Sequence, residues 1–258
     1  MEHTGLKQAE MKRVGAKRAD ASHRRRAGAV LAAVLILVAP LASAAAVAAA
    51  SQASASTPAA VGGFSAAEWT VRWWRWTLSF PDGLEPYLDR DGSRCAMGQD
   101  GDGPVWFLAG TNGRFDAKRR CQIPTGKHLL VPVINMYVYR PRLGPYAMDC
   151  AEVKRRAAVN NDYLVSAVAL LDGKPLPRPA RLISRCFDPQ AERDDSGPDD
   201  RRGVWRAAAD GYWLLLPPLT PGPHRLSIGA NYGNPDDPDH GRSLQNFEYE
   251  LQVGDPAI

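Results

Sequence analysis

The clearest pattern of hydrophobic and polar positions lies in residues 64–80. Trp69, Trp73, Trp76 and Phe80 follow one another at spacings of four, three and four residues. These spacings match the 3.6-residue period of an α-helix and place the four rings on one face. The pattern therefore predicts a helix with an aromatic stripe.

The ends of this helix are also marked in the sequence. Ser65 and Glu68 have the S-x-x-E spacing of a capping box, which satisfies two backbone N–H groups of the first turn. Pro81 ends the helix. Four tryptophans in eight residues favour a helix packed on a β-sheet, because aromatic side chains bury the most area. A stacking platform for sugar rings and a membrane-interface anchor are the alternatives.

Most of the later chain consists of short hydrophobic runs or alternating positions between turn residues, which is typical of β-strands. The run at 128–139 is interrupted by Pro132, which predicts either a break or a bulge in the strand. Asp172-Gly173 predicts a hairpin turn after a strand at 164–171. A short helix is expected at 148–160. The other expected strands span 104–110, 181–187, 211–216, 224–229 and 247–253, and one begins at 121.

This order of elements predicts a mainly β fold. We expect an antiparallel β-sandwich, jelly-roll-like or immunoglobulin-like, with an N-terminal Trp-rich helix and one further short helix. Residues 64–258 are long enough to form a single domain with its own core. Residues 51–63 are small, polar and turn-prone, so we expect a flexible linker there.

The first fifty residues have the composition of a signal peptide. A stretch rich in Lys and Arg precedes an uncharged, alanine-rich segment at 27–50. We therefore expect a secreted or extracytoplasmic protein of the cell envelope. An uncleaved membrane anchor is the alternative, and contact with a membrane is expected only through this segment. The alanine content and Pro40 argue against the anchor.

Removing residues 1–50 changes the charge balance. The chain has 32 Lys and Arg against 28 Asp and Glu, for a net charge of +4. Eight of the basic and three of the acidic residues lie in residues 1–50, so the remaining 24 and 25 nearly cancel. A near-neutral domain lacks the excess of cations that binding to nucleic acid requires, so we expect no nucleic-acid partner.

Four cysteines, an even number, lie after residue 50. An exported protein meets an oxidising compartment, so two disulfides are expected. Three pairings are open, and we favour Cys95–Cys121 and Cys150–Cys186 because neighbours in the sequence close the shorter loops. The sequence has no CxxC or Cys/His spacing that would favour a metal site instead.

Several short motifs follow one another in the first half of the domain. They are Trp73-Trp74-Arg75-Trp76, Ser79-Phe80-Pro81, Cys95-Ala96-Met97-Gly98-Gln99, Gly103-Pro104-Val105-Trp106-Phe107-Leu108-Ala109-Gly110, Cys121-Gln122-Ile123-Pro124-Thr125-Gly126-Lys127 and Pro132-Val133-Ile134-Asn135. In this order they resemble a family of uncharacterised secreted bacterial proteins. The resemblance covers about residues 64–140 and implies no activity, ligand or catalytic residue. It places Cys95 and Cys121 on either side of the 104–110 strand, in agreement with the pairing above.

Two acidic, turn-rich loops contain candidate Ca²⁺ ligands. Asp89 and Asp91 lie in one loop, and Asp236 and Asp239 lie in the other. Carboxylate oxygens are the ligands that Ca²⁺ prefers, but neither spacing is that of an EF-hand. We favour solvated loops and expect no cofactor.

No nucleophile elbow, HExxH motif or P-loop is present, so no residue is singled out as catalytic and we lean against an enzyme. The favoured function is non-catalytic binding of a carbohydrate or another envelope component, with Trp74 and Trp76 as candidate binding residues. A secreted hydrolase that uses Asp and Glu carboxylates is one alternative. A structural or partner-interaction protein of the cell envelope is another.

Overall fold

The structure, a computed structural model, describes residues 59–191, 204–237 and 241–254. The predicted signal at 1–50 and most of the predicted linker lie outside these residues. Val61 exchanges backbone hydrogen bonds with Phe64, so the end of the predicted linker belongs to the domain. The elements are α1 (Ala66–Leu78), η1 (Pro86–Leu88), β1 (Val105–Phe107), β2 (Ala117–Ile123), β3 (His128–Pro141), α2 (Cys150–Ala158), η2 (Asn161–Tyr163), β4 (Leu164–Leu171), β5 (Lys174–Pro175), β6 (Ala180–Ile183), β7 (Trp205–Leu216), β8 (Gly222–Tyr232) and β9 (Leu244–Val253).

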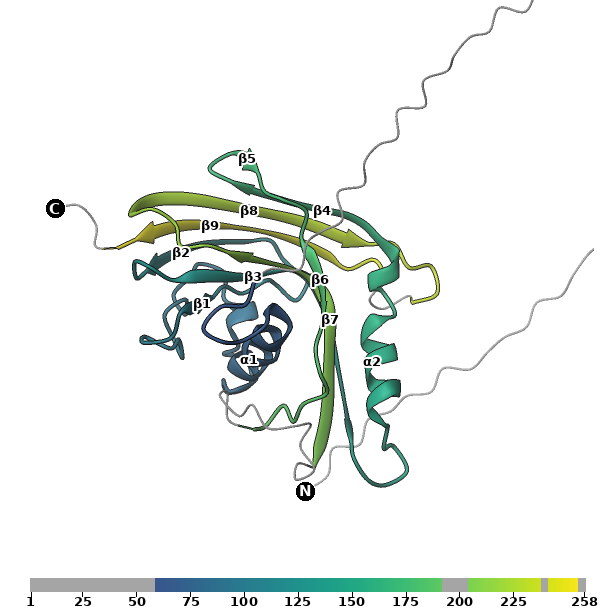
Figure 1. The fold of residues 1–258 in the computed structure, drawn as a ribbon. Coiled ribbons are helices and arrows are strands. Elements are labelled where there is room, and N and C mark those ends of the chain that lie inside the picture. Colours follow the sequence, from purple (N-terminus) through teal and green to yellow (C-terminus); the bar gives the residue numbers. More distant parts are fainter. Residues whose placement is uncertain (1–58, 192–203, 238–240, 255–258) are drawn as a thin grey trace, which may run out of the picture. The chain divides into compact units, whose positions relative to one another are not determined.

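The described chain is mainly β, with two mixed sheets (Figure 1). The first sheet has the strand order β1-β3-β7-β6 and the second has the order β2-β9-β8-β4-β5. Strand β1 runs parallel to β3, and β2 runs parallel to β9. The other neighbouring strands are antiparallel. The prediction of wholly antiparallel sheets was therefore wrong at two pairs, each of which joins strands that are not consecutive in the chain.

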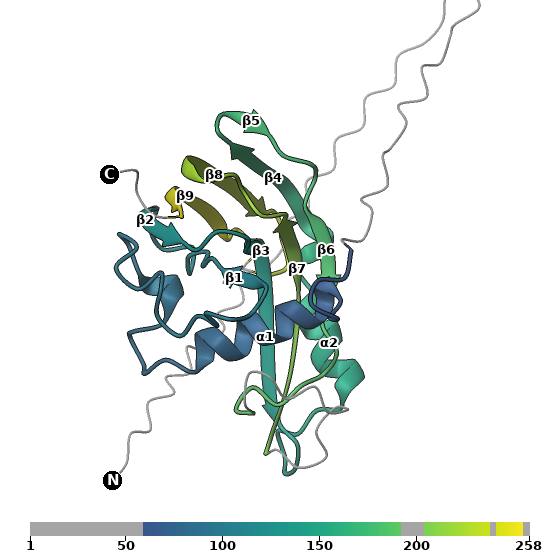
Figure 2. The ribbon, with the colours of Figure 1, turned by 60° about the vertical axis from the view of Figure 1, so that its left-hand side comes forward.

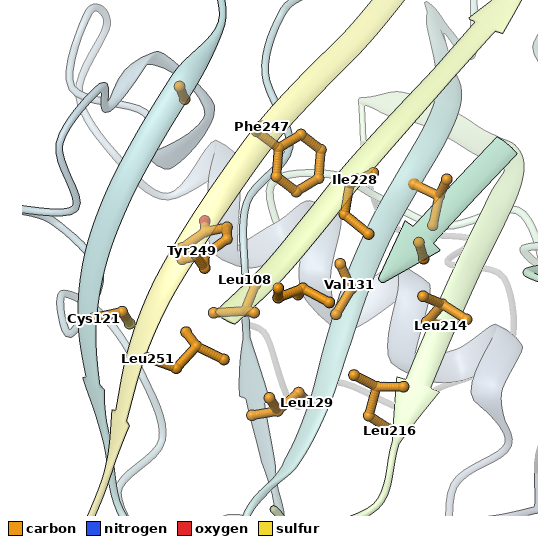
Figure 3. Packing of buried hydrophobic residues seen from close by; sticks show 14 of the residues in the cluster. Leu108, Cys121, Leu129, Val131, Leu214, Leu216, Ile228, Phe247, Tyr249 and Leu251 are labelled. Carbon is orange, nitrogen blue, oxygen red and sulfur yellow. The ribbon is translucent and has the colours of Figure 1, made fainter. Parts of the chain in front are cut away.

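The two sheets share one hydrophobic core. Alternate residues of β9 point inward, including Phe247, Tyr249 and Leu251, and meet Leu129 of β3 and Leu214 of β7 (Figure 3). This period of two is the one that the sequence shows for the last strand, because successive side chains of a strand lie on opposite faces. The core therefore forms from the alternation that the sequence predicts.

Helix α1 covers the other face of the first sheet (Figure 2). The predicted stripe of Trp69, Trp73 and Trp76 is buried, and these rings pack with Phe107 of β1 and Trp213 of β7. The indole N–H groups of the three stripe residues each donate to a backbone carbonyl. The stripe therefore packs in the core without leaving these polar groups unpaired.

Only half of the predicted capping box forms at the start of α1. The Ser65 hydroxyl accepts a hydrogen bond from the backbone N–H of Glu68 at 3.2 Å. The carboxylate of Glu68 instead pairs with Arg185, at 2.8 Å from its Nε. A long-range ion pair thus replaces the local bond that a capping box would make.

Helix α2 lies on the opposite face of the first sheet from α1. Its Val153 packs with Val138 and Ala208, whereas the adjacent residues Tyr137 and Ala207 pack with Val71 of α1. Neighbouring residues of a strand point to opposite faces, so the far part of the sheet is covered on both sides. Both helices are therefore positioned by the same two strands.

Two disulfides join Cys95 to Cys121 and Cys150 to Cys186, which is the pairing favoured from the sequence. Their Cα–Cα distances are 5.7 and 5.9 Å, within the usual range for a disulfide. Such bonds indicate an oxidising, extracytoplasmic environment.

Among the described residues, no helix is long and apolar enough to cross a membrane.

A buried arginine, Arg119, connects the second sheet to the loops around it. Only 1% of its surface is exposed. Its Nε donates to the carbonyl of Asp89 at 2.8 Å, and its two Nη atoms donate to the carbonyls of Ala109 at 2.6 Å and Gly110 at 2.9 Å. One Nη also donates to the Tyr249 hydroxyl at 3.0 Å. The guanidinium thus bonds three carbonyls, of which only that of Ala109 has a further donor within the described chain, the Tyr249 hydroxyl at 2.9 Å.

We expect Arg119→Met to lower the free energy of unfolding by about 3 kcal/mol or more, because it leaves several buried acceptors without donors. Arg120→Met is the matched control, since the Arg120 side chain is 86% exposed, and we expect little change. Urea unfolding followed by circular dichroism measures both. Equal losses in the two variants would contradict the role assigned to Arg119.

Candidate functional site

The candidate site begins where β1 separates from β3. The two strands pair over three residues, and the N–H of Leu108 then donates to the carbonyl of Leu130. The next residue, Ala109, bonds to the second sheet instead, through the Tyr249 hydroxyl and Arg119. The segment after β1 therefore diverges from β3, and the edge of β3 continues beyond it.

Along this gap, the edge of β3 that faces away from β7 is not paired with a neighbouring strand of the described chain. Ala209 of β7 accepts a hydrogen bond from the backbone of Ser184, and its own N–H donates to the Ser184 hydroxyl, on the side away from β3. Tyr137 lies opposite Ala209 in the register, and Tyr139 lies opposite Ala207. In an antiparallel pair the peptide groups alternate between the two edges. The N–H and C=O of Tyr137 and Tyr139 therefore point away from β7, toward the gap, and the carbonyl of Tyr139 accepts a hydrogen bond from the Arg140 guanidinium there at 2.7 Å.

A hollow of about 470 Å³ lies along this gap, and we call it the first hollow. Its walls come from α1, η1, the segment after β1, the middle of β3 and the start of β9. Its polar side chains include Thr111, Asn112, Asn135 and Gln245. The amide of Gln245 holds the backbone N–H and C=O of Thr111, both at 2.8 Å. This clamp fixes one wall of the hollow.

Aromatic rings form another part of the lining. Trp74 stacks on Tyr137 with centroids 4.5 Å apart, and Tyr137 stacks on Tyr139 at 5.6 Å. Trp205 meets Tyr139 edge to face at 5.3 Å. The row continues into a second hollow of about 570 Å³, which shares Leu78, Tyr137 and Tyr139 with the first. We call the two hollows together the aromatic groove.

The structure separates the two candidate binding tryptophans. Trp76 is 2% exposed, and its indole N–H donates to the carbonyl of Met97 at 3.1 Å, so it cannot offer a face to a ligand. Trp74 is only partly buried and lines the first hollow. The prediction is therefore corrected for Trp76, which is a core residue. Trp74 lies beside the hydrophobic stripe rather than on it, which is why the two residues differ.

The ring wall contains two tyrosines and a tryptophan that the sequence analysis did not single out: Tyr137, Tyr139 and Trp205. A signal was present, because Tyr137 and Tyr139 are two residues apart and so share one face of a strand. Tyr139 is 47% exposed and is the more accessible of the two tyrosines. Burial raises the pKa of Tyr137 well above its ordinary value, so its hydroxyl stays protonated.

Tyr87 of η1 also lines the first hollow, and its surroundings are negatively charged. Burial, and then the charges of Glu85 and Asp82, raise the pKa of Tyr87 to about 12. Asp82 itself lines the second hollow. Carboxylates thus lie close to the ring wall.

The first pair of predicted Ca²⁺ ligands has another role. Asp89 is 5% exposed, and its carboxylate accepts hydrogen bonds from the backbone N–H groups of Asp91, Gly92 and Arg94 at 2.9–3.2 Å. It therefore caps its own loop, as short acidic side chains commonly do in turns. Asp91 is bonded in the same way to the N–H of Ser93.

The second predicted pair does not form a described site. Asp236 is exposed, and Asp239 lies outside the described residues. Among the residues that the structure describes, no group of three or more His, Cys, Asp or Glu side chains is arranged to hold a metal ion.

A separate cluster lies where the β4–β5 hairpin meets the start of β8. Nδ1 of His224 is 2.7 Å from the carboxylate of Asp172, and Nε2 is 2.9 Å from the carbonyl of Thr220 and 3.3 Å from its hydroxyl. The hydroxyl of Thr220, the imidazole of His224 and the carboxylate of Asp172 follow one another as the three groups of a catalytic triad do. With both ring nitrogens at hydrogen-bond acceptors, the charged imidazole fits best, and a charged ring is no base. We interpret the cluster as a clasp between two turns.

The comparisons with known proteins add no identity to this geometry. A scan against protein-family models, a search of curated proteins and a search of solved structures each gave no match. The resemblance to secreted bacterial proteins therefore stays a prediction, and the function has to be argued from the aromatic groove.

The clasp predicts a pH dependence of stability. Burial disfavours the charged ring, but the hydrogen bonds to Asp172 and Thr220 outweigh it and raise the pKa of His224. The hydrogen bond from His224 is the main cause that lowers the pKa of Asp172. The His224 contribution is thus complete below its unfolded pKa of about 6.5 and is lost as the pH rises through the folded value. The Asp172 contribution is present above about pH 4 and is lost as the pH falls.

We therefore expect His224→Gln to lower the melting temperature more at about pH 5.5 than at about pH 9. The effect should correspond to less than about 1 kcal/mol, because solvent screens the Asp172 carboxylate, whose side chain is 44% exposed. Calorimetry of both proteins across this range measures it. A difference between the proteins that is constant with pH would contradict the assignment.

Proposed function

We propose that this protein is a non-catalytic carbohydrate-binding protein that acts outside the cytoplasm, in the cell envelope or after secretion. The observation that carries the proposal is the row of rings formed by Trp74, Tyr137, Tyr139 and Trp205 along two adjoining hollows. We also infer that the two sheets form a β-sandwich of the jelly-roll-like or immunoglobulin-like kind, the scaffold expected from the sequence.

The chemistry of the groove supports a sugar ligand. A pyranose has C–H groups that pack on aromatic rings and hydroxyl groups that need hydrogen-bond partners. The groove offers the rings of β3 together with the hydroxyl of Ser243 and the amides of Asn112 and Asn135. Binding sites commonly combine an apolar, aromatic wall with a small number of placed polar groups. The peptide edge of Tyr137 adds a backbone donor and acceptor.

The length of the ring row supports an oligosaccharide. Three successive ring contacts, of 4.5, 5.6 and 5.3 Å between centroids, lead from α1 along β3 to β7. A single sugar ring would contact only part of this row. A chain of several sugars would cover it and would gain affinity at each ring.

The location is supported by two independent features. The disulfides indicate an oxidising compartment. Residues 1–50 have the composition of an export signal. A glycan ligand is consistent with this location, because envelope polysaccharides lie outside the cytoplasm.

We expect Tyr139→Ala to weaken binding to the best oligosaccharide of a glycan panel by about tenfold or more, equivalent to about 1.4 kcal/mol. Tyr139 is suited to this test because it is 47% exposed and its loss should leave the core intact. Tyr146→Ala is the matched control, since Tyr146 is 77% exposed and lies in neither hollow.

Isothermal titration calorimetry of the three proteins measures the effect. The absence of binding to every glycan in the panel would overturn the proposed function. Equal losses in the two tyrosine variants would place the binding surface elsewhere on the domain.

A further inference from the structure

Three acidic residues surround the ring wall of the aromatic groove. Asp82 lines the second hollow. Glu85 lies beside Tyr87, which lines the first hollow, and one of its carboxylate oxygens is buried without a hydrogen-bond partner. Asp188 acts electrostatically on Tyr137, which belongs to both hollows. The carboxylates come from two segments far apart in the sequence: Asp82 and Glu85 act on Tyr87, and Asp188 acts on Tyr137.

The positive charge in the groove is already engaged. Among the described residues that line the two hollows, the only Lys or Arg is Arg75 of α1. It is 3% exposed, its Nε donates to the carbonyl of Asp188 at 3.0 Å, and its guanidinium lies 5.8 Å from the centroid of the Phe187 ring. A charge buried in this way offers little to a ligand, whereas Asp82, the other charged residue among the described lining residues, is exposed. Arg140 lines neither hollow, and its guanidinium donates to the carbonyl of Tyr139 at 2.7 Å.

The aromatic side chains act in the same direction. The faces of Trp and Tyr rings carry negative charge density and attract cations within about 6 Å. The raised pKa of Tyr87 reflects both its burial and the negative charges of Glu85 and Asp82 beside it. The edge carbonyl of Tyr137 provides a further acceptor that faces the first hollow. Rings, carboxylates and a backbone acceptor therefore all favour a positively charged group.

We propose that the ligand of the aromatic groove is an amino sugar oligosaccharide with unacetylated, positively charged amino groups. This inference rests on the proposed carbohydrate-binding function and specifies its substrate class. The sugar chain packs against Tyr139, whose ring is the more exposed of the two tyrosines, and an ammonium group lies beside Tyr87, where Asp82 and Glu85 supply the opposite charge. Charge-assisted hydrogen bonds of this kind are about twice as strong as neutral ones.

The test compares two probes that share the same sugar backbone and differ at the 2-amino group, which is a charged ammonium in one and a neutral acetamide in the other. The first is a fully deacetylated β-1,4-linked glucosamine tetramer, and the second is the same tetramer fully N-acetylated. Titration calorimetry at about pH 5.5, where the amines are protonated, should show the deacetylated probe binding about tenfold more tightly to the wild-type protein. Added salt should reduce this preference, because it screens the charges.

Two variants assign the preference to the groove. In Asp82→Asn combined with Glu85→Gln, the ratio of the two affinities should fall toward one. Asp102→Asn is the matched control, because Asp102 is exposed and lies in neither hollow, and it should keep the wild-type ratio. Circular dichroism of each variant shows whether the fold is retained.

The outcomes distinguish this inference from the proposed function. If both tetramers bind equally, or if only neutral glycans bind, the protein is a carbohydrate-binding protein but the charge preference is wrong. If no glycan binds, the proposed function itself fails. If the double variant and Asp102→Asn keep the same preference, the preference is not due to the groove and the inference is overturned.

Discussion

The buried guanidinium of Arg119 is the interaction on which the site depends. It takes up the carbonyls of Ala109 and Gly110 and thereby draws the chain after β1 toward the second sheet. If that segment had stayed paired with β3, the edge of β3 beyond Leu130 would be covered. The gap beside β3, the first hollow and the access to its rings all follow from this divergence. A charge that stabilises the core thus also creates the surface that we assign to binding.

Much of the fold could be predicted from local patterns. The stripe of Trp69, Trp73 and Trp76 gave the correct helix and its buried face, and the alternation at the end of the chain gave β9. Parallel pairing could not be predicted, because it depends on which distant strands meet. The first half of β7 was also missed, since the run Ala207-Ala208-Ala209 carries no alternation of large hydrophobic and polar residues.

The site was harder to predict than the fold. Trp74 was identified correctly as a candidate, but Trp76 could be distinguished from it only by knowing what covers each side of α1. Arg119 stands in a basic run that looks solvated, although it shares the inward alternation of Ala117 and Cys121. The groove itself arises where a strand leaves its neighbour. That event is determined by long-range hydrogen bonds and has no local signature in the sequence.

The bulge in β3 between Pro132 and Ile134 has a consequence for how such a groove could arise or be lost. Before the bulge, Leu130 faces α1, and after it the odd-numbered residues Tyr137 and Tyr139 do so. One extra residue in the strand exchanges the side chains that face α1 with those that face the opposite side of the sheet. Deleting that residue would turn the tyrosines toward α2 without substituting either of them. In this fold, the choice between a ligand-binding face and an ordinary packed face is therefore made by chain length, so insertions and deletions could create or abolish the groove where substitutions would only adjust it.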